Sequence, residues 1–75
     1  MGVGGKIITE MITEIGIVAG EIWSLLEKKG DVSLRNVVKM IDKPRELILM
    51  SIGWLAREGH IVLKREDNDY KVCLR

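Results

Sequence analysis

The stretch of sequence that decides the fold runs from residue 53 to residue 74 and reads GWLAREGHIVLKREDNDYKVCL. It opens with the end of a helical pattern, which Gly59 terminates. Two β-rich runs follow at residues 61–66 and 70–74, and the polar cluster at 67–69 between them has the composition of a turn. Two such runs joined by a short polar turn predict a β-hairpin.

Three helices are predicted before this hairpin. Apolar residues between positions 7 and 29 recur at steps of three and four, which predicts one long helix that Gly30 ends. Ser33 is suited to the N-cap of a short second helix over residues 34–41. A third helix is predicted over residues 44–58, because a proline at the first helical position loses no helical hydrogen bond.

This order of elements predicts a mainly α fold with a small β-hairpin, of the α+β class. Three helices followed by a two-stranded wing are the plan of a winged helix-turn-helix domain. The two residues at 31–32 leave room for one extended pair between the first two helices. We expect residues 1–6, which are short and rich in glycine, to form a flexible N-terminus, and residues 7–75 to form the single domain.

The composition fits a folded binding module. The chain has 75 residues, of which 47% are hydrophobic and only 4% aromatic, so Ile, Val, Leu and Met must build the core. The formal net charge is +1. Proteins that bind nucleic acid are usually markedly basic, because contacts with phosphates supply much of the affinity. DNA binding by this chain would therefore require its positive charges to gather on one face.

Several functional classes are excluded by the residues that are missing. One cysteine and one histidine, Cys73 and His60, cannot form an internal disulfide or a zinc site, and a lone thiol favours a reducing, cytoplasmic compartment. The sequence has no phosphate-binding loop and no paired-carboxylate motif, so we predict no catalytic residues, no metal and no cofactor. Glu10, Glu14 and Glu21 interrupt the first apolar run, which excludes a membrane span there.

Two motifs resemble a known group of proteins. Residues 19–23 read AGEIW and residues 53–61 read GWLAREGHI. In both, the chain is similar to a small family of stand-alone prokaryotic winged helix-turn-helix proteins of unknown function. The similarity extends over nearly the whole chain after Lys6. It implies the winged-helix fold, and it implies little about function, because fold alone does not decide function.

The first functional hypothesis is binding to double-stranded DNA in transcription regulation, with the third helix as the recognition element. The residues predicted to contact DNA are Lys43, Arg45 and Arg57, helped by Lys39 and Lys64. Arg35 and Asn36 on the second helix are further candidates for phosphate contacts. The acidic wing tip at residues 66–69 argues against insertion of the wing into a DNA groove.

The second hypothesis is a protein-interaction adaptor that kept the scaffold and does not bind DNA. Leu49, Met50 and Trp54 would then form the binding surface. The alternative for Leu49 and Met50 is a core position under the second helix or the wing, and the alternative for Trp54 is packing against the wing or the first helix. Trp23 is expected in the core. Gly53 lies in mid-helix, which predicts a close neighbour that compensates its low helix propensity.

The first helix is longer than the other helices need, which predicts a homodimer. The residues predicted for dimerisation are Ile8, Met11, Ile12, Ile15 and Gly16. Gly16 and Gly20 are four residues apart and would leave a flat spot on which another backbone could lie. Close packing within the chain explains the two glycines equally well at this stage.

Overall fold

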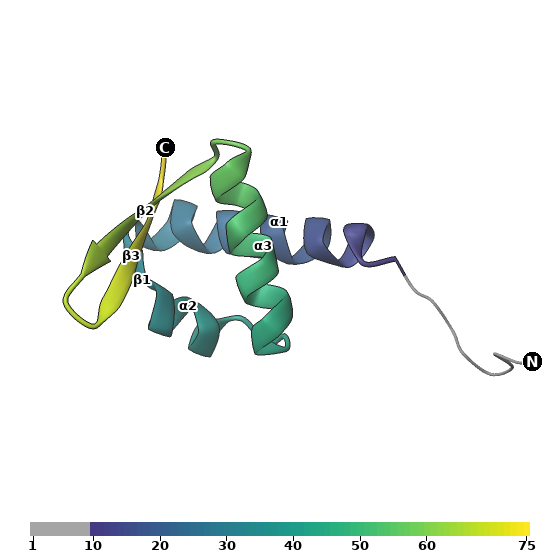
Figure 1. Cartoon of the computed structure of the whole chain (residues 1–75), viewed down its shortest axis with the longest axis horizontal. Coiled ribbons are helices and arrows are strands. Elements are labelled where there is room, and N and C mark those ends of the chain that lie inside the picture. The colour runs from purple at the N-terminus through teal and green to yellow at the C-terminus, as the bar shows by residue number, and fades with distance from the viewer. Residues whose placement is uncertain (1–9) are drawn as a thin grey trace, which may run out of the picture.

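The computed structural model describes residues 10–75, which form three helices and three strands. In chain order these are α1 (Ile12–Lys29), β1 (Val32–Ser33), α2 (Leu34–Met40), α3 (Arg45–Arg57), β2 (Ile61–Glu66) and β3 (Asp69–Leu74). Figure 1 shows α3 crossing α1, with the β2–β3 hairpin at the far end from the start of α1. The predicted winged helix-turn-helix fold is confirmed. The proposed N-terminal segment 1–6 and the predicted helical residues 7–9 lie outside the described part of the chain.

The helices are slightly shorter than predicted. Glu10 and Met11 precede α1, and Met11 is an N-cap whose apolar side chain offers no acceptor to the first amides of the helix. Ile41 was predicted as helical, but it is the C-cap of α2 in an extended conformation. Pro44 is the N-cap of α3 and not its first residue, because the proline ring fixes φ at −57° while ψ stays extended at 140°.

The predicted two-stranded wing, β2 and β3, is confirmed, and β1 between the first two helices joins it in a three-stranded sheet. Strand β3 lies in the middle, paired antiparallel with β2 on one edge and with β1 on the other. The hairpin register runs from Ile61 opposite Leu74 to Glu66 opposite Asp69. Two residues therefore make the turn, and Asp67 adopts the positive φ (44°) that such tight turns need.

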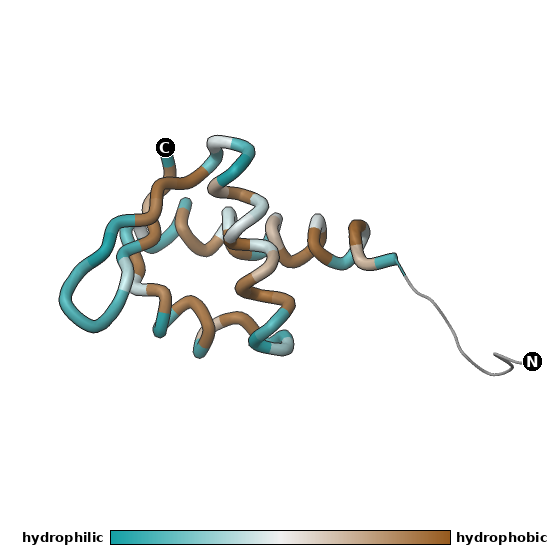
Figure 2. The backbone as a smooth tube through the Cα atoms, in the orientation of Figure 1, coloured by the Kyte–Doolittle hydropathy of each residue, from teal (hydrophilic) through white to brown (hydrophobic). Residues whose placement is uncertain are grey.

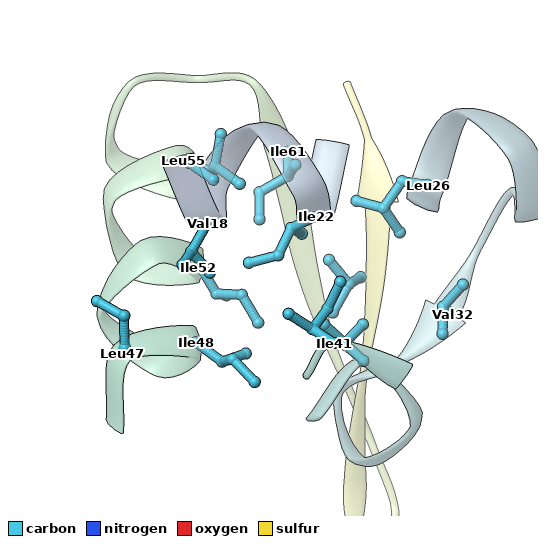
Figure 3. Close-up of a cluster of buried hydrophobic side chains, with 13 residues drawn as sticks. Val18, Ile22, Leu26, Val32, Ile41, Leu47, Ile48, Ile52, Leu55 and Ile61 are labelled. Atoms are coloured by element: carbon cyan, nitrogen blue, oxygen red, sulfur yellow. The ribbon is translucent and has the colours of Figure 1, made fainter. Parts of the chain in front are cut away.

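The core lies between α1, α3 and the sheet. Its fully buried side chains come from every layer: Val18, Ile22 and Leu26 of α1, Val37 of α2, Ile48 of α3, Ile61 of β2 and Val72 of β3. Figure 3 shows side chains from α1, such as Ile22, and from α3, such as Ile52, gathered with Ile61 in one cluster. Burial of one such side chain contributes roughly 1.5–3 kcal/mol. Ser51 is buried among them, and its hydroxyl donates a hydrogen bond to the carbonyl oxygen of Leu47 at 2.8 Å.

The first turns of α1 extend beyond the other described elements (Figure 1). In Figure 2 these turns are coloured largely hydrophobic, whereas the wing loop is hydrophilic. Ile12 is 79% exposed and Met11 is also exposed. Ile15, one turn later, is half-buried and packs against the core. The apolar start of α1 is therefore only partly covered within the described chain.

No helix within residues 10–75 is both long enough and apolar enough to cross a lipid bilayer.

Candidate functional site

A shallow depression marks the junction of α2, α3 and the wing. Its volume is about 160 Å³, and it is lined by Leu34, Arg35, Val38, Arg45, Asn68, Asp69 and Tyr70. Asp69 holds the junction together, because its carboxylate accepts hydrogen bonds from the backbone N–H of Tyr70 (2.7 Å) and of Arg35 (3.4 Å). The start of α2 is fixed separately by Ser33, whose hydroxyl oxygen accepts from the backbone N–H of Asn36 at 3.1 Å. The wing tip and α2 are thus joined beside the first residue of α3.

Positive charge gathers at this junction. Arg35 and Arg45 are both exposed, and neither forms an ion pair within residues 10–75. Arg65 lies nearby on the wing, its guanidinium carbon 6.0 Å from the centre of the Tyr70 ring. Such an arrangement stiffens the arginine while leaving its donors available. Asp69 is the acidic residue of the depression, and backbone amides already occupy its carboxylate.

The other predicted DNA contacts lie apart from this junction. The ammonium group of Lys43 forms an ion pair with Glu21 of α1 at 2.8 Å. Arg57 ends α3, about 18 Å from Arg45 along a helix of 13 residues. Lys64 lies on β2 opposite Lys71, and Lys71 is paired with Glu66 at 3.3 Å. Lys39 is exposed on α2. The structure therefore brings Arg45 together with Arg35, and not with Lys43 or Arg57.

Sequence reasoning missed part of the junction. Asn68 was assigned only to a turn and Tyr70 only to a strand, yet both line the depression with the two arginines. The contact between Arg65 and Tyr70 could have been predicted from the hairpin, because a two-residue turn makes these residues direct cross-strand partners. The approach of the wing tip to α2 had no local signal, because Arg35 and Asp69 are 34 residues apart.

The outward side of α3 is apolar. Leu49 is 36% exposed and Met50 is 48% exposed, so neither is the core residue that the alternative interpretation placed under α2 or the wing. Trp54 leans toward His60, with 6.1 Å between the ring centroids, but it remains 45% exposed. These three side chains are available to a partner.

A larger groove lies between α1 and the C-terminal half of α3. It has a volume of about 400 Å³ and is lined by Gly16, Ala19, Gly20, Trp23, Trp54, Leu55 and His60. His60 is held at its edge by backbone hydrogen bonds, its N–H donating to Leu55 (2.9 Å) and its carbonyl oxygen accepting from Arg75 (3.1 Å). The expected core position of Trp23 is wrong: it is 39% exposed, because it follows Ile22 directly and is rotated about 100° from the buried stripe.

The glycines of α1 and α3 have no close neighbours. A Cβ added at Gly16, Gly20 or Gly53 would meet no described atom within 4 Å outside its own stretch of helix. The predicted close neighbour of Gly53 is therefore not found in the described chain. Packing within the described chain also does not explain the two glycines of α1, which form a bare strip along the groove.

The described residues include one free thiol and no cluster of metal-binding side chains. No group of three or more His, Cys, Asp or Glu side chains within residues 10–75 is placed to hold a metal ion. Cys73 is a buried free thiol on β3, as expected for a core cysteine. Burial raises its pKa, and Asp31 raises it further as a hydrogen-bond acceptor and as a negative charge. A thiol of this kind is a poor nucleophile.

Comparison with known proteins agrees with the architecture. Residues 8–74 match the family model described as a winged helix-turn-helix domain, DUF2582. The chain belongs to this family. The chain is also similar to the uncharacterised protein MJ1608 of Methanocaldococcus jannaschii. The two are 36% identical over 69 residues, which cover 88% of this chain and 97% of the relative. The resemblance inferred from the two motifs is confirmed. Winged-helix domains of this kind are typically not enzymes, and their fold is compatible with DNA binding.

Proposed function

We propose that this chain is a small, non-enzymatic DNA-binding protein of the cytoplasm, associated with transcription, with α3 as its recognition helix. One observation carries the proposal. Two arginines without an ion-pair partner in the described chain, Arg35 and Arg45, meet at the junction of α2, α3 and the wing. These are the elements with which winged helices approach a duplex.

Each element of the junction has a distinct expected role. Arg45 is in the first turn of α3, where recognition helices direct side chains toward base edges and neighbouring phosphates. Arg35 sits on α2, which positions the domain along the backbone. Lys39, Arg57 and Lys64 extend the contact at its margins. A homodimer, as predicted from the sequence, would present two copies of α3 to two half-sites.

The acidic residues limit how the domain can dock. Glu66 and Asp67 lie at the wing tip and would be repelled by phosphates. We therefore place the contact on the residues of the hairpin that line the depression, Tyr70 and Asn68, with Glu66 and Asp67 outside it. Since log affinity falls by about 0.9 per contacted phosphate for each tenfold rise in salt, few contacts imply a shallow salt dependence for one domain.

The test is fluorescence anisotropy of a labelled random-sequence duplex, titrated at low and at near-physiological ionic strength. We expect micromolar binding that weakens with salt. Arg45→Ala and Arg35→Ala should each weaken binding roughly tenfold or more and lower the salt slope by about 1. Lys28→Ala, which removes one exposed positive charge from the last turn of α1, is the matched control and should bind as the parent does.

Two further results decide between the candidate contacts. Lys43→Ala should change binding less than Arg45→Ala, because the Lys43 ammonium group is already paired with Glu21. If Lys28→Ala weakens binding as much as Arg45→Ala, the interaction is diffuse charge attraction and the junction has no special role. Absence of binding even at low salt would exclude DNA as the partner.

The second candidate function, a protein-interaction adaptor, rests on a different observation. Leu49 and Met50 are exposed on α3. The chain as a whole also has a formal net charge of only +1. Exposed apolar side chains on one helix face suit a protein partner better than a phosphate backbone. This function gains support if the parent chain does not bind DNA at low salt. It loses support if Arg45→Ala abolishes DNA binding and Met50→Asp leaves it unchanged.

A further inference from the structure

One exposed face of α1 is almost free of charge. Beside the stripe that enters the core, it consists of residues at steps of four, four and three: Ile12, Gly16, Gly20 and Trp23. Between residues 12 and 24 the charged residues of α1 are Glu14 and Glu21, and Glu21 is paired with Lys43. A helix face turned to water normally carries polar and charged side chains, so this face is unusual for a solvated surface.

The same face forms the floor of the groove between α1 and α3. Trp23 and Trp54 line it together with the bare glycine strip, and both rings are well exposed. Since a Cβ at Gly16 or Gly20 would meet no described atom within 4 Å, a second backbone can approach α1 closely there. The groove is therefore shaped for a helix that brings apolar side chains of moderate size.

We propose that the occupant of this groove is α1 of a second copy of the chain, packed antiparallel across a two-fold axis. The axis would pass between Gly16 and Gly20, so that Gly16 of each copy faces Gly20 of the other. Ile12 of each copy would then reach the neighbourhood of Trp23 and Trp54 in the partner. Every contact is made twice, as an isologous interface requires.

The projecting start of α1 is the argument for a second copy over an unrelated partner. Met11 and Ile12 are exposed beyond the core, and no described element covers them (Figure 1). The chain thus carries both an open apolar groove and a projecting apolar helix end. Ile8, which was also predicted for dimerisation, lies outside the described residues. Ile15 packs mainly on its own core, whereas Gly20, Trp23 and Trp54 join the contact.

The size of the contact also favours reciprocal packing. A stable interface buries roughly 800 Å² on each partner. Full burial of a large aromatic side chain removes 150–250 Å², so Trp23 and Trp54, at 39% and 45% exposure, can each add about 90 Å². The two rings thus supply less than a quarter of the area. An antiparallel helix pair supplies further area on both copies at once, and a net charge of +1 opposes self-association only weakly.

This inference does not depend on DNA binding. The groove involves the C-terminal half of α3, whereas Arg45 is the first residue of that helix. It assigns Trp54 to self-association, and not to the surface for a different protein. The dimer can therefore be present or absent whatever the outcome of the DNA titration.

The test is the mass of the full chain by sedimentation equilibrium or light scattering over a wide concentration range. The 8.5 kDa chain should approach twice that mass with rising concentration. Gly20→Gln should raise the dimer dissociation constant roughly 10- to 100-fold, the range that overpacking of a close contact costs. The monomer tolerates this change, because the site is open and glutamine is a better helix former than glycine.

Gly53→Gln is the matched control. It makes the same exchange at an equally open position in mid-helix, but Gly53 does not line the groove, so the dimer should persist. Ile12→Glu gives an independent check, since it places a charge on a side chain that is 79% exposed in the monomer and buried in the proposed dimer. Circular dichroism confirms that each variant is folded.

Each outcome has one interpretation. A dimer weakened by Gly20→Gln and Ile12→Glu but retained in Gly53→Gln supports the proposed contact. A parent chain that stays monomeric at all concentrations overturns it. A dimer that survives both Gly20→Gln and Ile12→Glu uses another surface, and also overturns it.

Discussion

At the scale of single residues, Gly53 is a position whose surroundings could not be predicted from the sequence. The glycine at position 53 was expected to have a close neighbour, since glycine weakens a helix. None is present within 4 Å in the described chain. A glycine in the sequence does not show whether the space beside it is filled by the same chain, by a partner or by solvent. The surroundings of Gly53 are known only from the structure.

The glycine at position 53 therefore gives a stability prediction. Gly53→Ala should raise the free energy of unfolding by up to about 1 kcal/mol, because alanine favours the helix and its Cβ enters open space. Urea unfolding followed by circular dichroism measures the change. Gly59→Ala is the contrasting variant: φ at Gly59 is +82°, so alanine there should lower the stability by roughly 1–2 kcal/mol. A loss of stability in Gly53→Ala would mean that something does pack against that position.

At the scale of elements, local signals were sufficient for the short helix α2. Ser33 was predicted as its N-cap, and its hydroxyl oxygen accepts from the N–H of Asn36 at 3.1 Å. With only seven residues, α2 has few hydrogen bonds of its own and depends on this cap. We expect Ser33→Ala to lower the free energy of unfolding by about 1 kcal/mol.

Thermal and urea unfolding of the Ser33→Ala variant check this value. The matched control is Ser24→Ala, which makes the same change at an exposed position inside α1. Alanine is the better helix former there, so the control should be neutral or slightly stabilising. Equal losses in both variants would show that the Ser33 hydroxyl does not act as a cap.

Contacts between elements that are far apart in the chain could not be predicted from the sequence. Periodicity and turn composition gave the three helices and the hairpin, because these signals lie within each segment. Strand β1 has two residues, and its partner Val72 is 40 positions away from Val32, so no local pattern could establish the pairing. The ion pair between Lys43 and Glu21 likewise joins residues 22 apart. Arg45 and Arg35 were both predicted as candidate contacts, but Asn68 and Tyr70 beside them at the junction were not.

At the scale of the whole molecule, β3 connects the parts. It is the central strand, pairs with both β1 and β2, and supplies Val72 to the core that α1 and α3 share. Cys73, the next residue, is buried on the same strand. Exposing this thiol requires separation of the central strand from its neighbours. Its titration therefore reports on the cooperative unfolding of the domain.

This position predicts how stability changes with pH. Burial and then Asp31 raise the pKa of Cys73 in the folded state above its value in the unfolded chain, which is about 8.5. The unfolded chain therefore loses the thiol proton first as pH rises. The contribution of Cys73 to stability is complete below about pH 8.5 and is lost as pH climbs from there toward the folded pKa.

Comparison with Cys73→Ala isolates this contribution from the tyrosine and lysines that titrate at higher pH. The free energy of unfolding of the parent chain should fall more between pH 7.5 and pH 9.5 than that of the variant, when both are measured by urea unfolding under reducing conditions. The variant itself should be less stable at pH 7.5, because a buried side chain is truncated. Parallel pH profiles for the two proteins would show that the thiol has the same pKa folded and unfolded, and so that the centre of the sheet does not shield it from water.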